Sequence, residues 1–189
     1  MRKAVILHGT GSSHTGAWFP WVKKELERLG YEVWVPDLPK SDFPDIKRYN
    51  DFLLNSSWDF SDNLIIGHSS GAVEILGLLE VLPTSIKIDT GILVGSFTKE
   101  ILIGSNWDNL KGLFTQPFDF SKIKQKANKF IFIHSDNDPY CPLEQAEFLH
   151  KKIGGEFILM PGQQHFSRHL DPKYDRFPEL IKVIKQKVI

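Results

Sequence analysis

Residues 67–71 read Gly-His-Ser-Ser-Gly and interrupt an otherwise apolar stretch of the chain. Gly-x-Ser-x-Gly between a strand and a helix is typical of a nucleophile elbow, a sharp turn that exposes the hydroxyl of the central serine. Ser69 is therefore the candidate nucleophile. The alternative is a glycine-rich turn whose serines only cap the following helix. Residues further along the chain favour the first interpretation.

A serine nucleophile needs a base to take its proton, and that base needs an acid to orient it. The chain offers Asp138 in the segment HSDNDPYCP and His165 in the segment LMPGQQHF. Nucleophile, acid and histidine then follow one another in an order known for such triads. Asp136 is the rival acid, but its place directly after an apolar run favours a turn-forming role, whereas Asp138 precedes a proline that favours extended backbone. His169 is the rival base.

Acyl transfer also needs N–H groups that stabilise the oxyanion of the tetrahedral intermediate. The loop at 8–11, His-Gly-Thr-Gly, follows the first apolar run and supplies Thr10 as one candidate donor. The second candidate is the N–H of Ser70, which comes directly after the nucleophile.

The same first loop could be taken for a nucleotide site. Residues 11–16 have the glycine spacing of a phosphate-binding loop, but Ala17 and Trp18 stand where that loop needs Lys and Ser or Thr. A dinucleotide fingerprint also fails, because His14 occupies the position of its third glycine. Both nucleotide interpretations are therefore excluded.

These residues must be positioned by the apolar runs that precede them. The runs predict six strands, at 3–9, 31–37, 63–68, 89–96, 129–135 and 156–162, with helical spacing of apolar residues near 17–29, 45–54, 71–82, 142–153 and 173–188. Continuous apolar strands joined by helices are typical of a parallel sheet in an α/β fold. Between them, residues 97–128 are too long and mixed for one crossover helix, and we expect short irregular helices over the edge of the sheet.

In an open α/β sheet, ligands bind where loops converge at the carboxyl ends of the strands. The candidate catalytic residues all lie in such loops. His8, Trp18, Trp107 and Phe166 are the candidates for contact with substrate. Because 97–128 is too short for a large helical lid, we expect a preference for short acyl groups.

Composition narrows the classes of protein to consider. At 189 residues the chain fits one globular domain. Lys plus Arg and Asp plus Glu each number 23, so no net charge attracts nucleic acid or an anionic membrane. One cysteine excludes an internal disulfide framework, and the first apolar run is too short for a signal peptide. We expect a cytoplasmic protein with a small-molecule ester or amide substrate, no nucleic-acid or membrane partner, no cofactor and no metal.

Four segments carry a family resemblance: HGTGSSHTGAWFPWVKKEL, IIGHSSGA, HSDNDPYCP and GQQHF. They resemble the small lidless serine hydrolases of the retinoblastoma-binding protein 9 family, over nearly the whole chain. The resemblance implies the triad Ser69, Asp138 and His165 and activity on small esters, or aminopeptidase-like activity. The Leu-x-Cys-x-Glu segment that binds retinoblastoma protein is absent, so that partner is not implied.

We therefore predict a single-domain α/β-hydrolase fold with six parallel strands in the order 2-1-3-4-5-6. Two alternatives stay open at this point. One is a non-catalytic protein of the same fold that binds a ligand in its cleft, and the other is an acyltransferase or thioesterase that uses the same triad.

Overall fold

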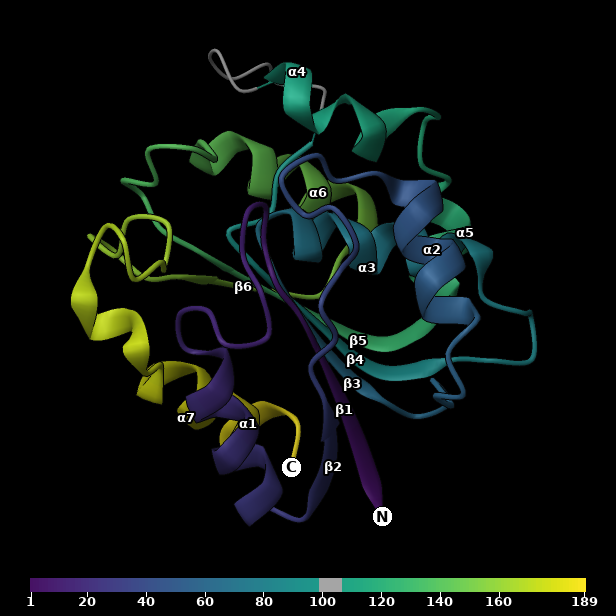
Figure 1. Ribbon diagram of the computed structural model, residues 1–189, viewed down its shortest axis with the longest axis horizontal. Helices are drawn as coiled ribbons and strands as arrows, with labels where there is room; N and C mark the ends of the chain where they lie inside the picture. The colour runs from purple at the N-terminus through teal and green to yellow at the C-terminus, as the bar shows by residue number, and fades with distance from the viewer. Residues whose placement is uncertain (99–106) are drawn as a thin grey trace.

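The computed structural model describes residues 1–98 and 107–189. Its centre is a six-stranded parallel sheet in the order β2-β1-β3-β4-β5-β6 (Figure 1). The strands are β1 (Arg2–Leu7), β2 (Tyr31–Trp34), β3 (Leu64–His68), β4 (Ile88–Val94), β5 (Ala127–His134) and β6 (Glu156–Leu159). The predicted strands, their parallel direction and their order are confirmed.

Helices cover both faces of this sheet (Figure 1). They are α1 (Phe19–Arg28), α2 (Ile46–Leu54), α3 (Ser70–Val81), α4 (Trp107–Leu110), η1 (Lys111–Phe114), α5 (Phe120–Gln125), α6 (Leu143–Ile153), η2 (Pro172–Asp175) and α7 (Pro178–Lys187). Side chains of one strand alternate between two cores: Ala4 and Ile6 pack with α1 and α7, whereas Val5 and Leu7 pack with α2, α3 and α6. The five predicted helical segments correspond to α1, α2, α3, α6 and α7.

The central helix α3 is buried almost all round, from Ser70 to Leu79. This explains why its sequence is apolar on every side instead of amphipathic. Because α3 packs tightly against the sheet, the loop that precedes it is held at a fixed place above the ends of β1, β3 and β4.

The described part of the region between β4 and β5 contains the short helices α4, η1 and α5, as expected. Leu113, Phe114 and Ile123 from this region belong to the core on the α3 face of the sheet, which corrects the expectation that the region lies over an edge. Residues 99–106 and the Trp107 side chain lie outside the described part. None of the helices described is long and apolar enough to cross a membrane.

Candidate active site

Ser69 lies on a strained turn between β3 and α3. Its φ of 56° and ψ of −121° are rare for a residue with a side chain. A Cβ atom on Gly67 would lie 2.3 Å from the Gly71 carbonyl oxygen, and one on Gly71 would lie 2.2 Å from the Leu7 carbonyl oxygen. Both glycines are therefore required for the close packing of the turn, as expected for a nucleophile elbow.

Asp138 and His165 meet although 27 residues separate them in sequence. His165 Nδ1 donates a hydrogen bond of 2.7 Å to Asp138 Oδ2, and the Asp138 side chain is fully buried. Its other oxygen, Oδ1, accepts hydrogen bonds of 2.9 Å from the N–H groups of Tyr140 and Cys141. The carboxylate is thus held in one orientation, facing the imidazole.

The pKa of Asp138 reflects two opposing effects. Burial raises the pKa. The hydrogen bond and charge interaction with His165, together with the two backbone N–H groups, lower it by more than burial raises it, so the pKa lies below its usual value of 3.8. The carboxylate is therefore ionised at neutral pH. An ionised partner keeps the proton of the neutral imidazole on Nδ1 and leaves Nε2 free to accept one.

The loops after β5 and β6 are joined by four successive polar contacts. Besides the Asp138–His165 bond, Asp136 Oδ1 accepts from the Gly162 N–H, Ser135 Oγ from the Gln163 N–H, and Asn137 Oδ1 from the Gln164 N–H, each at 2.8 Å. Asp136 accepts a backbone N–H, as expected, but from the loop after β6 and not from its own turn. Together these contacts fix the loop that carries His165.

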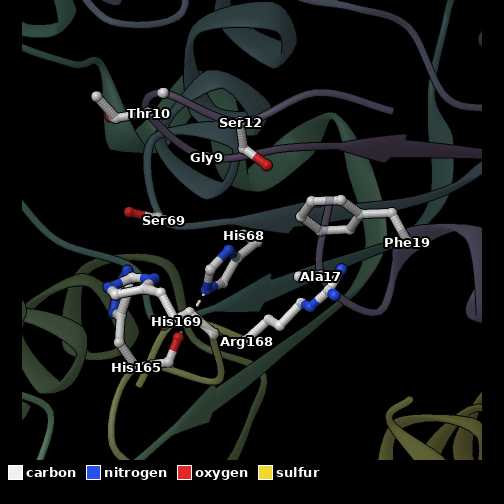
Figure 2. Close-up of a pocket in the computed structure, with 12 residues that line it drawn as sticks. Gly9, Thr10, Ser12, Ala17, Phe19, His68, Ser69, His165, Arg168 and His169 are labelled. Carbon is white, nitrogen blue, oxygen red and sulfur yellow. Dashed lines mark hydrogen bonds between the residues drawn. The ribbon is translucent and has the colours of Figure 1, made fainter. Parts of the chain in front are cut away.

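His68, the second residue of the elbow, provides a further link to this loop. Its Nε2–H donates a hydrogen bond of 2.8 Å to the His165 carbonyl oxygen, drawn as a dashed line in Figure 2. Burial, followed by repulsion from His165, lowers the pKa of His68 to about 3. His68 is therefore neutral at ordinary pH and acts as a hydrogen-bond donor between the two loops.

Ser69, His165 and Thr10 line one pocket of about 390 Å³ (Figure 2). Ser70 begins α3, and the first N–H groups of a helix have no acceptor within it. In the described part of the chain, no backbone acceptor outside the regular elements pairs with the Thr10 N–H. The arrangement therefore offers a nucleophile, an oriented base and two candidate N–H donors around one cavity.

The sequence matches the serine hydrolase family, described as "Serine hydrolase", over residues 4–186. The chain belongs to the serine hydrolase family. It is 26% identical over 186 residues to serine hydrolase RBBP9 of Rattus norvegicus, covering 97% of this chain and 94% of that protein. It is also 29% identical over 167 residues to the putative hydrolase YdeN of Bacillus subtilis (strain 168), covering 87% of this chain and 86% of YdeN.

Solved structures place this serine hydrolase among the α/β-hydrolases. The crystal structure of the ydeN gene product has a TM-score of 0.89 at 25% identity and covers 98% of both chains. Est1E of Butyrivibrio proteoclasticus, solved with ferulic acid bound, has a TM-score of 0.70 at 15% identity, covers 98% of this chain and 87% of its own, and shares the fold. The predicted family and fold class are confirmed.

The structure corrects three of the four expected substrate contacts in this serine hydrolase. His8, Trp18 and Phe166 are fully buried and are not among the residues that line the pocket. His8 accepts from the Leu38 N–H and donates to the Gly9 carbonyl, so both ring nitrogens are occupied. Trp18 Nε1 donates to the Phe166 carbonyl oxygen at 3.0 Å, in the core beside α1 and α7.

The pocket of this serine hydrolase is instead lined by residues of the loops after β1, β3 and β6, together with His68 at the end of β3 and Phe19 at the start of α1. The lining residues are Gly9, Thr10, Gly11, Ser12, Ala17, Phe19, His68, Ser69, His165, Ser167, Arg168 and His169. Arg168 was not predicted from the sequence, because a single arginine in a loop carries no recognisable pattern. His169, the rival base, is at the pocket but hydrogen-bonds Tyr140 Oη at 3.0 Å, not a carboxylate.

One group of described residues has the composition of a metal site. Asp138, Cys141 and His165 place three ligand-type atoms within 4.8 Å of one another. However, the His165 Nδ1–H is already donated to Asp138. Burial, followed by repulsion from Asp138, raises the pKa of the Cys141 thiol well above its usual value, so no thiolate is present at neutral pH. The hydrogen bond between Asp138 and His165 therefore explains why these ligand-type atoms lie close together.

Proposed function

We propose that this serine hydrolase cleaves small esters or amides through a triad of Ser69, His165 and Asp138. The observation that carries the proposal is the buried 2.7 Å hydrogen bond between Asp138 and His165, at the pocket that also exposes Ser69. A serine on a strained turn, a histidine and an oriented carboxylate are the three parts that nucleophilic acyl transfer requires.

In the first half-reaction, Ser69 Oγ attacks the substrate carbonyl carbon while its proton passes to Nε2 of His165. Asp138 stabilises the imidazolium that forms, and the N–H groups of Thr10 and Ser70 donate to the oxyanion. The carbon–oxygen or carbon–nitrogen bond then breaks, and the leaving group takes the proton from His165. An acyl group is left on Ser69.

In the second half-reaction, His165 removes a proton from water and the hydroxide attacks the acyl carbon. The tetrahedral intermediate collapses, Ser69 regains its proton, and a carboxylic acid leaves. Each step uses only groups that line the pocket or contact a group that does.

The pocket favours small substrates. Its volume of about 390 Å³ is at the lower end of the usual range for ligand sites, roughly 300 to 1,000 Å³. None of its lining residues comes from the described helices α4, η1 and α5. Of these, η1 and α5 pack on α3, and α4 packs on η1. We therefore propose that the substrates have short acyl chains and that the activity is carboxylesterase-like or aminopeptidase-like. We also propose a cytoplasmic location.

The experiment is a kinetic comparison of wild type and Ser69→Ala on p-nitrophenyl esters from acetyl to dodecanoyl, aminoacyl anilides and acyl thioesters. Ser85→Ala, at an exposed serine away from the pocket, is the matched control. Turnover of the short esters that Ser69→Ala loses and Ser85→Ala keeps would support the proposal. A rate that rises steadily to dodecanoyl would contradict the size preference, and a thioester preference would favour the thioesterase alternative.

A further inference from the structure

In the described part of the chain, the ionisable side chains that line the pocket are all basic. Arg168 lines it together with His68, His165 and His169, and the lining residues in the described part of the chain include no aspartate or glutamate. Asp138 is fully buried, hydrogen-bonded to His165. Arg168 is therefore the permanently charged group at the wall, because a guanidinium does not lose its proton in proteins.

Arg168 is tied to the catalytic loop. It follows His165 by three residues, in a turn closed by hydrogen bonds of 3.1 Å from the Leu170 and Asp171 N–H groups to the Ser167 carbonyl. In Figure 2 its side chain extends away from Ser69 toward Ala17. A substrate group held by Arg168 would thus lie at a distance from the carbonyl that Ser69 attacks.

The guanidinium keeps free donors although it has a partner. Its Nε lies 2.9 Å from Asp175 Oδ1 in an ion pair, and Asp175 is not a lining residue of the pocket. That contact occupies Nε and leaves the edge formed by Nη1 and Nη2, which fits a second carboxylate in bidentate geometry. The Arg168 side chain is 63% exposed, so a ligand that enters the pocket can reach it.

We propose that Arg168 selects substrates that carry a carboxylate remote from the bond that is cleaved, such as half-esters of short dicarboxylic acids. The inference rests on the proposed function, since it assigns a substrate class to the same pocket. A carboxylate is favoured over a neutral end group because it matches the planar fork of the guanidinium and meets no acidic side chain on the wall.

The first test compares kcat/KM for two pairs of matched esters. Mono-p-nitrophenyl glutarate and p-nitrophenyl pentanoate differ in a carboxylate on the acyl side, and 4-acetoxybenzoate and phenyl acetate differ in one on the leaving-group side. The readout is the ratio of charged to neutral ester within each variant, so that differences in folding cancel. Arg168→Gln should lower this ratio about fivefold, as expected for a partly exposed ion pair, and 1 M salt should lower it in wild type.

Arg176→Gln is the matched control, since this exposed arginine lies eight residues further on and does not line the pocket. It should leave both ratios unchanged, and Arg168→Glu should lower one of them further than Arg168→Gln does. A change in either pair supports the proposal and assigns the carboxylate to that side of the substrate. Equal ratios for Arg168→Gln and Arg176→Gln in both pairs would overturn it.

A second test separates this inference from the proposed function. In the Ser69→Ala background, monomethyl glutarate and methyl pentanoate are titrated calorimetrically, with and without Arg168→Gln. Binding needs no turnover, so this test judges Arg168 even when no ester is hydrolysed, a result that would count against the proposed function alone. Tighter binding of monomethyl glutarate that Arg168→Gln removes supports the proposal, and equal binding of both ligands overturns it.

Discussion

Replacing Asp138 by asparagine is the substitution whose effect the structure defines most sharply. Oδ1 would still accept from the Tyr140 and Cys141 N–H groups, so the amide NH₂ would take the place of Oδ2 and face His165 Nδ1. Two donors would then oppose each other, and the imidazole would move its proton from Nδ1 to Nε2. A protonated Nε2 cannot accept the proton of Ser69. The same change in a serine protease lowers kcat about 10⁴-fold, equivalent to about 5.4 kcal/mol in the activation free energy.

The assay is kcat on p-nitrophenyl acetate together with the thermal midpoint of unfolding. Asp136→Asn is the matched control two residues away, because asparagine keeps the oxygen that accepts from the Gly162 N–H. We expect Asp138→Asn to stay folded and lose at least two orders of magnitude in kcat, and Asp136→Asn to affect mainly stability, by about 1 kcal/mol or less. A folded Asp138→Asn with near-normal kcat would refute the assignment of Asp138 as the triad acid.

Three further substitutions test the packing around the site. His68→Phe removes the donor to a buried carbonyl and should lower stability by about 1 to 3 kcal/mol and reduce kcat. Since the folded pKa of His68 lies below its unfolded value of 6.5, the stability loss should be full above pH 7 and shrink as pH falls below 6.5; a pH-independent loss would contradict the burial argument. Glu74 is fully buried with no partner for either oxygen in the described structure, and burial, followed by repulsion from a neighbouring acid, raises its pKa well above 4.5. Glu74→Gln should therefore gain stability relative to wild type as pH rises above 4.5, and equal midpoints at pH 5 and pH 8 would count against it. Gly71→Ala would place Cβ 2.2 Å from the Leu7 carbonyl oxygen and should lower the free energy of unfolding, measured with denaturant, by roughly 4 kcal/mol or more. Gly30→Ala, where φ is 85° but nothing lies within 4 Å, should lower it by only about 1 kcal/mol. Equal losses of stability would exclude the steric explanation.

The fold could be predicted from sequence because its signals are local and repeated. Each strand is a short apolar run, and each of the main helices has apolar residues on at least one face, so element type and order followed from the pattern. The region between β4 and β5 was harder, since Leu113, Phe114 and Ile123 show no periodicity, and only tertiary packing places them on the α3 face.

The site was predictable where a residue type is tied to a motif, and not where contact depends on loop geometry. Ser69 and its flanking glycines have a recognisable spacing. By contrast, Trp18 and Phe166 appeared free to contact substrate, but loop aromatics cannot be told from core aromatics by sequence, and both are fully buried. Ser135 and Asn137 were not singled out, because their hydrogen bonds cross between two loops far apart in the chain.

The most direct measurement of the central claim is the site of covalent labelling by a fluorophosphonate probe, mapped by peptide mass spectrometry. Such probes react with an activated serine, and the structure exposes Ser69 at the pocket while the Ser70 side chain is buried. We predict one adduct per chain, on Ser69, that is absent in Ser69→Ala. A label on Ser70 or Ser12, or undiminished labelling of Ser69→Ala, would contradict the assignment of Ser69 as the nucleophile.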